Sequence, residues 1–183
     1  ITLRNDVTFQ NGEKMTGAKV EASLKRLIEK SKRAADALGI ESIHSDGQTV
    51  TIKTKLEQPI MKDLLAEPYS VIVDVDGKAA SDKSPVGTGP FLIKTYTPET
   101  GATLEAYENY WGGKAKVAQV QIKYFSDPTA ISAALQSKEV DAVYGLHYAN
   151  LASFKKDSQY KISEKEGGRY LSYVYNFENP YVV

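Results

Sequence analysis

The sequence predicts an α/β fold with a mixed (α+β) sheet, because helical and strand patterns are interleaved along the chain. Apolar side chains recur at helical spacing at Val20, Leu24 and Leu27. They alternate with polar side chains over 50–54, as in a strand with one face in water. Over 117–144 a strand pattern, a helix pattern and a second strand pattern follow one another, and this order predicts a partly parallel sheet.

The first part of the chain is predicted to hold one helix after two short strands. Residues 1–4 and 7–9 are typical of brief strand segments, and Asn11–Gly12 predicts the turn after them. Thr16 is a good N-cap for the helix. The basic cluster Lys30–Arg33 is expected at the C-terminal end of that helix, where positive charge complements the helix dipole.

A hairpin, a short helix and a strand are predicted next. The hairpin spans 40–56, with its turn at 45–47. Proline opens the helix at 59–65, where apolar residues again have helical spacing. The run 69–73 is typical of a strand. The polar stretch 74–84 after it is the best candidate for a domain boundary.

The second half is predicted to begin at the turn Pro85–Phe91. Its two glycines leave the backbone free to take positive φ, while prolines hold both ends. Trp111 lies beside two glycines and predicts a packing anchor at a tight bend. Asp127 and Pro128 are typical of an N-cap and a first helical residue. The other predicted elements are a hairpin over 91–97 and 103–107, strands over 117–124, 140–144 and 169–177, and a helix over 149–156.

The composition excludes several classes of function. Lys and Arg number 23 and so do Asp and Glu, so no net field attracts nucleic acid or anionic lipid. No apolar run is long enough to predict a membrane span. The absence of cysteine excludes disulfides, thiolate metal sites and thiol catalysis. The chain starts at Ile1 in a strand-like run and ends at Val183 without a polar tail, so we expect a piece of a longer, processed protein.

No catalytic, cofactor or metal site is predicted. His44 and His147 are the only histidines, and neither has a partner at a metal-ligand spacing. Asp74–Gly77 lacks the later acidic ligands of a calcium loop, and Gly87–Gly89 lacks the lysine of a phosphate loop. Arg33 is the best candidate to bind a ligand, because a planar guanidinium can hold a carboxylate through two parallel hydrogen bonds.

Four stretches in order carry a resemblance to a known family: Thr2–Gly12, Pro85–Phe91, Asn109–Lys114 and Asp127–Thr129. They resemble the extracytoplasmic solute-binding proteins of ABC importers, in the family (family 5) that binds peptides and nickel complexes. The resemblance implies a periplasmic-binding-protein-like type II lobe with a small α+β accessory subdomain. It implies that residues 1–84 are the accessory subdomain and 85–183 the core of the first lobe. The second lobe and the return strand are then expected outside this chain.

Within the family, the sequence is most similar to the nickel-binding branch. As that similarity implies, arginines hold an anionic chelator that carries the metal, and Arg33 matches one of them. The expected function is to capture nickel as a chelate, or a small peptide, outside the cytoplasmic membrane and to deliver it to the ABC permease subunits. The expected ligand-binding residues are Arg33, Tyr69, Ser70, Tyr144 and His147.

The absence of a catalytic constellation favours a binding protein over an enzyme, and no cofactor or nucleic-acid partner is expected. A monomer is expected, in the periplasm or at the cell surface as a lipoprotein whose anchor lies outside this chain. Asp36 and Ser70 depart from the nickel branch, so an oligopeptide or dipeptide receptor with no metal role stays open. The acidic clusters and His147 leave a metal-dependent hydrolase open, and the twelve tyrosines leave a cell-surface interaction protein open.

Overall fold

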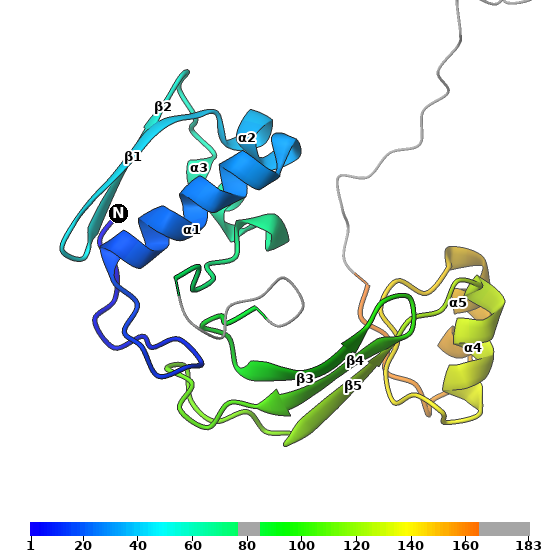
Figure 1. The fold of residues 1–183 in the computed structure, drawn as a ribbon. Coiled ribbons are helices and arrows are strands. Elements are labelled where there is room, and N and C mark those ends of the chain that lie inside the picture. Colours follow the sequence, from blue (N-terminus) through cyan, green and yellow to red (C-terminus); the bar gives the residue numbers. More distant parts are fainter. Residues whose placement is uncertain (77–84, 165–183) are drawn as a thin grey trace, which may run out of the picture. The chain divides into compact units, whose positions relative to one another are not determined.

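The computed structural model describes residues 1–76 and 85–164. The chain divides into two compact units, Ile1–Tyr124 and a second unit that begins at Phe125 (Figure 1). The predicted boundary between residues 84 and 85 falls inside the first of these units, and it stays a prediction. No helix in the described parts of the chain is both long and apolar enough to cross a membrane.

Helix α1 (Gly17–Lys30) confirms the first predicted helix. The Thr16 hydroxyl caps it by accepting a hydrogen bond from the backbone N–H of Lys19 at 3.4 Å. The prediction for the basic cluster Lys30–Arg33 is confirmed for Lys30, which lies in the last turn of α1, but it is wrong for Lys32 and Arg33. Ser31 is extended and caps a second helix, α2 (Lys32–Leu38), through the N–H of Ala34 at 3.2 Å. Arg33 therefore lies in a first helical turn, where the dipole disfavours positive charge.

The predicted hairpin is confirmed as β1 (Ile40–Asp46) and β2 (Thr49–Thr54), which pair antiparallel around Gly47 at φ +54°. Helix α1 lies across one face of this hairpin (Figure 1). Each apolar side chain buried between them contributes about 1.5–3 kcal/mol to stability. The core of this part is formed by Val20, Leu24, Ala34, Leu38, Ile40, Ile43 and Val50.

The predicted short helix is confirmed as α3 (Met61–Ala66), but the predicted strand 69–73 is wrong. Its first residues form a 3₁₀ turn, Pro68–Ser70, in which the N–H of Ser70 donates to the carbonyl of Glu67 at 2.9 Å. Proline fixes the backbone for such a turn and offers no N–H to a sheet. Of the predicted strand, Val73 alone forms a bridge, to Gly87.

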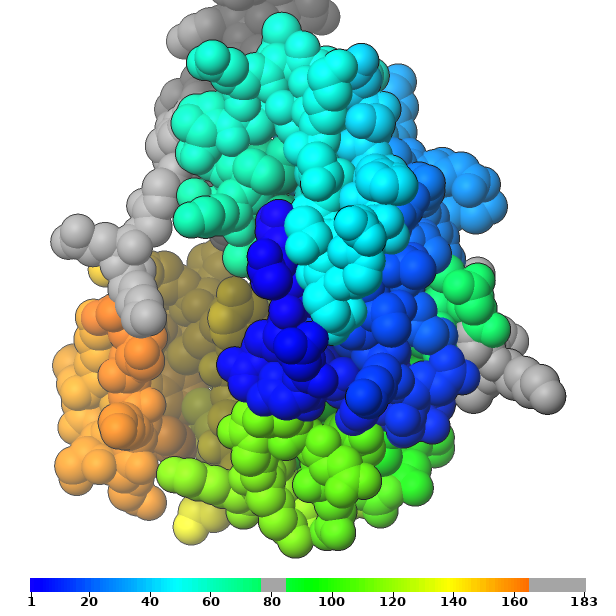
Figure 2. Space-filling model, turned by 90° about the vertical axis from the view of Figure 1, so that its left-hand side faces the viewer, coloured from blue at the N-terminus to red at the C-terminus, as the bar shows by residue number. Residues whose placement is uncertain are grey.

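The N-terminal residues connect the two halves of the first unit. They pair through single bridges, Thr2 to Thr49 and Thr8 to Lys14, instead of the two predicted strand segments. Gly12, at φ +87°, forms the predicted turn. Figure 2 shows these dark-blue residues between the cyan hairpin and the green residues that follow residue 85.

The second half of this unit is a three-stranded antiparallel sheet. Its order is β3 (Phe91–Thr97), β4 (Gly101–Ala106) and β5 (Gln119–Lys123), which confirms the predicted hairpin and the strand after it. Trp111 was predicted to be a packing anchor, but 41% of its surface is exposed. It is held by a hydrogen bond instead, in which its indole N–H donates to the carbonyl of Thr88 at 3.2 Å.

The turn Pro85–Phe91 differs from its prediction, because neither glycine takes positive φ. The side chain of Gln10 holds the segment instead. Its amide nitrogen donates to the carbonyls of Gly89 at 3.1 Å and Phe91 at 2.6 Å, and its oxygen accepts from the N–H of Gly87 at 3.2 Å.

The second unit contains α4 (Pro128–Gln136) and α5 (Tyr148–Lys155), and both predicted helices are confirmed. Asp127 caps α4 by accepting from the N–H of Thr129 at 2.8 Å. The two helices are joined by Asn150, whose amide donates to the Ser132 hydroxyl at 3.0 Å.

The predicted strand 140–144 is wrong, because these residues make no ladder with any described strand. Both sheets in the described part of the chain are antiparallel, so the predicted parallel pairing is not found there. Short apolar runs become strands only where a partner supplies hydrogen bonds. The predicted strand 169–177 lies outside the described residues.

Candidate functional site

Arg33 is presented to solvent by the first turn of α2. Its guanidinium carbon lies 5.9 Å from the centre of the Tyr69 ring, in cation–π geometry. Within residues 1–76 and 85–164, no carboxylate forms an ion pair with Arg33. The arginine is therefore positioned by an aromatic ring while its hydrogen-bond donors remain available.

Tyr69 comes from the 3₁₀ turn Pro68–Ser70, 36 positions further along the chain than Arg33. It is half-buried and packs against the apolar core of the α1–hairpin layer. The buried part of the ring fixes its position, and the remaining part faces Arg33. The structure thus brings together two of the predicted site residues.

Ser70 is buried, with 4% of its surface exposed. Its hydroxyl donates to the carbonyl of Leu64 near the end of α3 at 2.9 Å, and this carbonyl also accepts from the N–H of Glu67 at 3.3 Å. In this conformation the hydroxyl has no proton left to donate to a ligand. Its contribution is to fix the turn that carries Tyr69.

Tyr144 and His147 lie in the second unit, on the connection before α5. Tyr144 is fully exposed. His147 is the N-cap of α5, and its Nδ1 accepts from the N–H of Ala149 at 3.4 Å. This bond leaves Nε2, on the far side of the imidazole, as the nitrogen that can reach a ligand.

In the described ranges, no group of three or more His, Cys, Asp or Glu side chains is arranged to hold a metal ion. His44, the other histidine, is exposed on β1 opposite Thr51.

A buried charge cluster surrounds Asp74, which was predicted only as the first residue of the polar boundary stretch 74–84. The Asp74 carboxylate accepts from Lys19 Nζ at 2.6 Å and from the amide of Asn11 at 2.7 Å. Burial raises the pKa of Asp74, but these two hydrogen bonds outweigh burial and leave the pKa below its ordinary value. No local sequence pattern marks this cluster, because its members are up to 63 residues apart.

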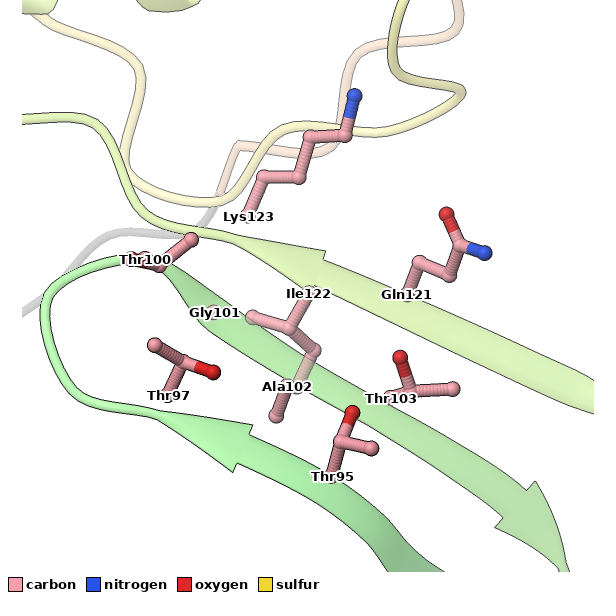
Figure 3. Close-up of a pocket in the computed structure, with 9 residues that line it drawn as sticks. All are labelled: Thr95, Thr97, Thr100, Gly101, Ala102, Thr103, Gln121, Ile122 and Lys123. Carbon is pink, nitrogen blue, oxygen red and sulfur yellow. The ribbon is translucent and has the colours of Figure 1, made fainter.

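A shallow depression of about 260 Å³ lies on one face of the three-stranded sheet. Figure 3 shows threonine side chains from β3 and β4 beside Gln121 and Lys123 of β5. None of the predicted ligand-binding residues lines it, so the depression is separate from the Arg33–Tyr69 pair. Its lining residues are Thr95, Thr97, Thr100, Gly101, Ala102, Thr103, Gln121, Ile122 and Lys123.

Comparison with known proteins gives consistent matches. Residues 1–182 match the family described as bacterial extracellular solute-binding proteins, family 5 Middle. The nickel-binding protein NikA of Staphylococcus aureus is 33% identical over 179 residues, which is 98% of this chain and 36% of that protein. A putative ABC transporter peptide-binding protein of Brucella ovis is 30% identical over 154 residues, covering 79% of this chain and 28% of that protein.

A solved structure shows the same fold. The crystal structure of NikA from Staphylococcus aureus in complex with Ni(L-His)2 matches with a TM-score of 0.80 and 33% identity. The match covers 86% of this chain and 34% of that one. This likeness confirms the predicted periplasmic-binding-protein-like fold. The chain spans about a third of the length of the relatives that it matches.

Proposed function

Because this chain belongs to family 5 of the bacterial extracellular solute-binding proteins, we propose that it is part of the substrate-binding component of an ABC importer. The component captures a small ligand outside the cytoplasmic membrane, in the periplasm or at the cell surface as a lipoprotein. It works as a monomer and delivers the ligand to the permease subunits. The family consists of solute-binding proteins, which supports binding without catalysis.

The observation that carries this proposal is the position of Arg33. A cation in the first turn of a helix is disfavoured by about 0.3–1 kcal/mol, so helix stability does not account for it. Contact with Tyr69 restricts the side chain and lowers the entropy lost when a ligand binds. A restrained guanidinium that no carboxylate of the described residues occupies suits a ligand carboxylate, which it can bind through two parallel hydrogen bonds.

Two ligand classes carry such a carboxylate. Histidine in a nickel–histidine chelate carries an α-carboxylate, and so does the C-terminus of a peptide. We infer that Arg33 binds this group, that Tyr69 provides a wall beside it, and that Ser70 positions Tyr69. Tyr144 and the Nε2 atom of His147 are proposed as further ligand contacts. Because Nδ1 accepts from Ala149, Nε2 of the neutral imidazole carries the proton and suits an acceptor such as a ligand oxygen.

The nickel chelate is the first candidate ligand, because 98% of this chain is similar in sequence to NikA. A peptide receptor with no metal role is the second, supported by the Brucella relative.

Isothermal titration calorimetry tests the proposal with two probes, nickel plus L-histidine and a short peptide with a free C-terminus. Arg33→Ala is expected to weaken binding of the true ligand about tenfold or more, as loss of a charge-assisted hydrogen bond implies. Lys32→Ala removes one positive charge from the neighbouring position and serves as the matched control, with unchanged affinity. Equal affinities for wild type and Arg33→Ala would contradict the role of Arg33. Binding of the peptide alone would select the second candidate.

A further inference from the structure

The turn before α1 contains the one Asn–Gly step of the sequence, Asn11–Gly12. This dipeptide is the most reactive one for loss of the side-chain amide, because glycine has no side chain to block its backbone nitrogen. Asn11 is exposed and Gly12 has a φ of +87°, so both residues lie in a turn that water reaches.

Three hydrogen bonds hold the reacting groups apart. The Asn11 amide donates to Oδ2 of Asp74 at 2.7 Å, and its oxygen accepts from the N–H of Glu13 at 3.1 Å. The N–H of Gly12, which would have to attack the carboxamide, donates to the carbonyl of Phe9 at 2.9 Å. The bond to Asp74 is charge-assisted and is therefore the strongest restraint of the three.

Asp74 is a rigid partner in this arrangement. It is 1% exposed, and its other oxygen, Oδ1, accepts from Nζ of Lys19 at 2.6 Å. Lys19 comes from α1 and also forms an ion pair with Glu13 at 2.6 Å. The charged groups that face Asp74 are thus Lys19 directly and Glu13 through Lys19.

We propose that Asn11 is the site of spontaneous deamidation in this protein and that Asp74 suppresses the reaction in the native fold. Hydroxide from the solvent removes the Gly12 N–H proton, and the nitrogen attacks Cγ of Asn11. Water protonates Nδ2 as its bond to Cγ breaks, and ammonia leaves while hydroxide is regenerated. Water then opens the resulting succinimide to aspartate or isoaspartate. Each product carries a new carboxylate against the buried carboxylate of Asp74, and Lys19 cannot neutralise both.

Peptide mapping by mass spectrometry measures the rate at Asn11 during incubation in mildly alkaline buffer. The native wild type is expected to react at least about tenfold more slowly than the urea-unfolded protein, since one charge-assisted hydrogen bond corresponds to about that rate factor. Native Asp74→Asn is expected to react faster than native wild type, because the charge-assisted bond is lost, but more slowly than the unfolded protein, because the bonds to Glu13 and Phe9 remain. Glu41→Gln, which removes an exposed carboxylate elsewhere in the unit, is the matched control and should react like wild type. Equal rates in native and unfolded wild type, or a wild-type rate in native Asp74→Asn, would overturn the proposal.

A second variant tests the consequence even if Asp74→Asn fails to fold. Asn11→Asp reproduces one product, and its unfolding equilibrium constant at neutral pH should rise about tenfold or more, the equivalent of one pKa unit. The difference from wild type should shrink on acidification, because protonation of either carboxylate removes the repulsion. Asn5→Asp adds the same charge at an exposed position and should match wild type. If Asn11→Asp is as stable as the Asn5→Asp control, the proposed repulsion between the new carboxylate and Asp74 is refuted.

Discussion

Nζ of Lys19 lies 2.6 Å from Oδ1 of Asp74, whose side chain is fully buried, although 55 residues separate the two in the sequence. The pair joins α1 to the segment that leads to Pro85–Phe91. Burial makes the contact costly to form, but it also makes loss of one partner costly, because the other charge cannot return to water. The ion pair thus fixes the segment around Asp74 against α1.

Lys19→Met is expected to destabilise the protein by about 3 kcal/mol, since it leaves Asp74 buried and without its cation. Urea unfolding monitored by circular dichroism measures the change. Lys53→Met is the matched control, because its ion pair with Glu41 is exposed and contributes less than about 1 kcal/mol. Equal unfolding midpoints for the two variants would show that the buried pair makes no net contribution.

Ionisation of the Glu21 carboxyl makes the stability of the first unit depend on pH. Hydrogen bonds from Lys25 at 2.5 Å and from the Ser45 hydroxyl at 2.6 Å lower the pKa of its carboxyl from 4.5 to about 2. A carboxyl with a lowered folded pKa stabilises the protein above its unfolded pKa, and this contribution disappears as the pH falls to the folded pKa. Wild type should therefore exceed Glu21→Gln in stability at neutral pH and lose that advantage between pH 4.5 and about 2.

Urea titrations of both proteins across this range measure the effect. If wild type and Glu21→Gln differ in their free energy of unfolding by the same amount at every pH, ionisation of the carboxylate does not cause the difference.

Local signals in the sequence predicted most of the helices, and the errors came where distant partners decide the structure. Thr16 and Asp127 cap the helices that they were expected to cap, because capping depends on a few consecutive residues. The runs 69–73 and 140–144 have strand-like composition, but pairing is a property of the whole sheet. Ser31 was not expected to end one helix and begin another, so the position of Arg33 was misjudged.

The candidate site was predicted only in part for a related reason. The contact between Arg33 and Tyr69 depends on the packing of α2 against the turn after α3, which no local pattern reveals. The hydroxyl of Ser70 looked available in the sequence, yet it is bonded to the carbonyl of Leu64. Asp74 has two partners that lie 55 and 63 positions away, so its role could not be predicted without the fold.

Lys138 offers a test of backbone strain in the second unit. It follows the C-cap of α4 at φ +60°, a left-handed conformation that glycine adopts without penalty. Lys138→Gly is therefore expected to stabilise α4 by about 0.5–1 kcal/mol. Hydrogen exchange of the α4 amides measures this locally. Ser137→Gly is the matched control, because Ser137 has a helical φ of −77° and glycine there should accelerate exchange. Faster exchange in both variants would contradict the assigned strain.

Gln10 is expected to hold the turn Pro85–Phe91 through the polarity of its amide, and Gln10→Glu tests this without changing the shape of the side chain. The native nitrogen donates to the carbonyls of Gly89 and Phe91, whereas a carboxylate would face both carbonyls with no proton to donate. We expect a loss of about 2 kcal/mol at neutral pH. Repulsion from the carbonyls raises the folded pKa of the new carboxyl, so the loss should fade as the pH falls and a proton restores one donor.

Urea unfolding at neutral and acidic pH measures both effects. Gln121→Glu, on the exposed face of β5, controls for the added charge and should leave stability nearly unchanged. If Gln10→Glu and Gln121→Glu change the stability to urea by the same amount, the turn is held by its own backbone and not by Gln10.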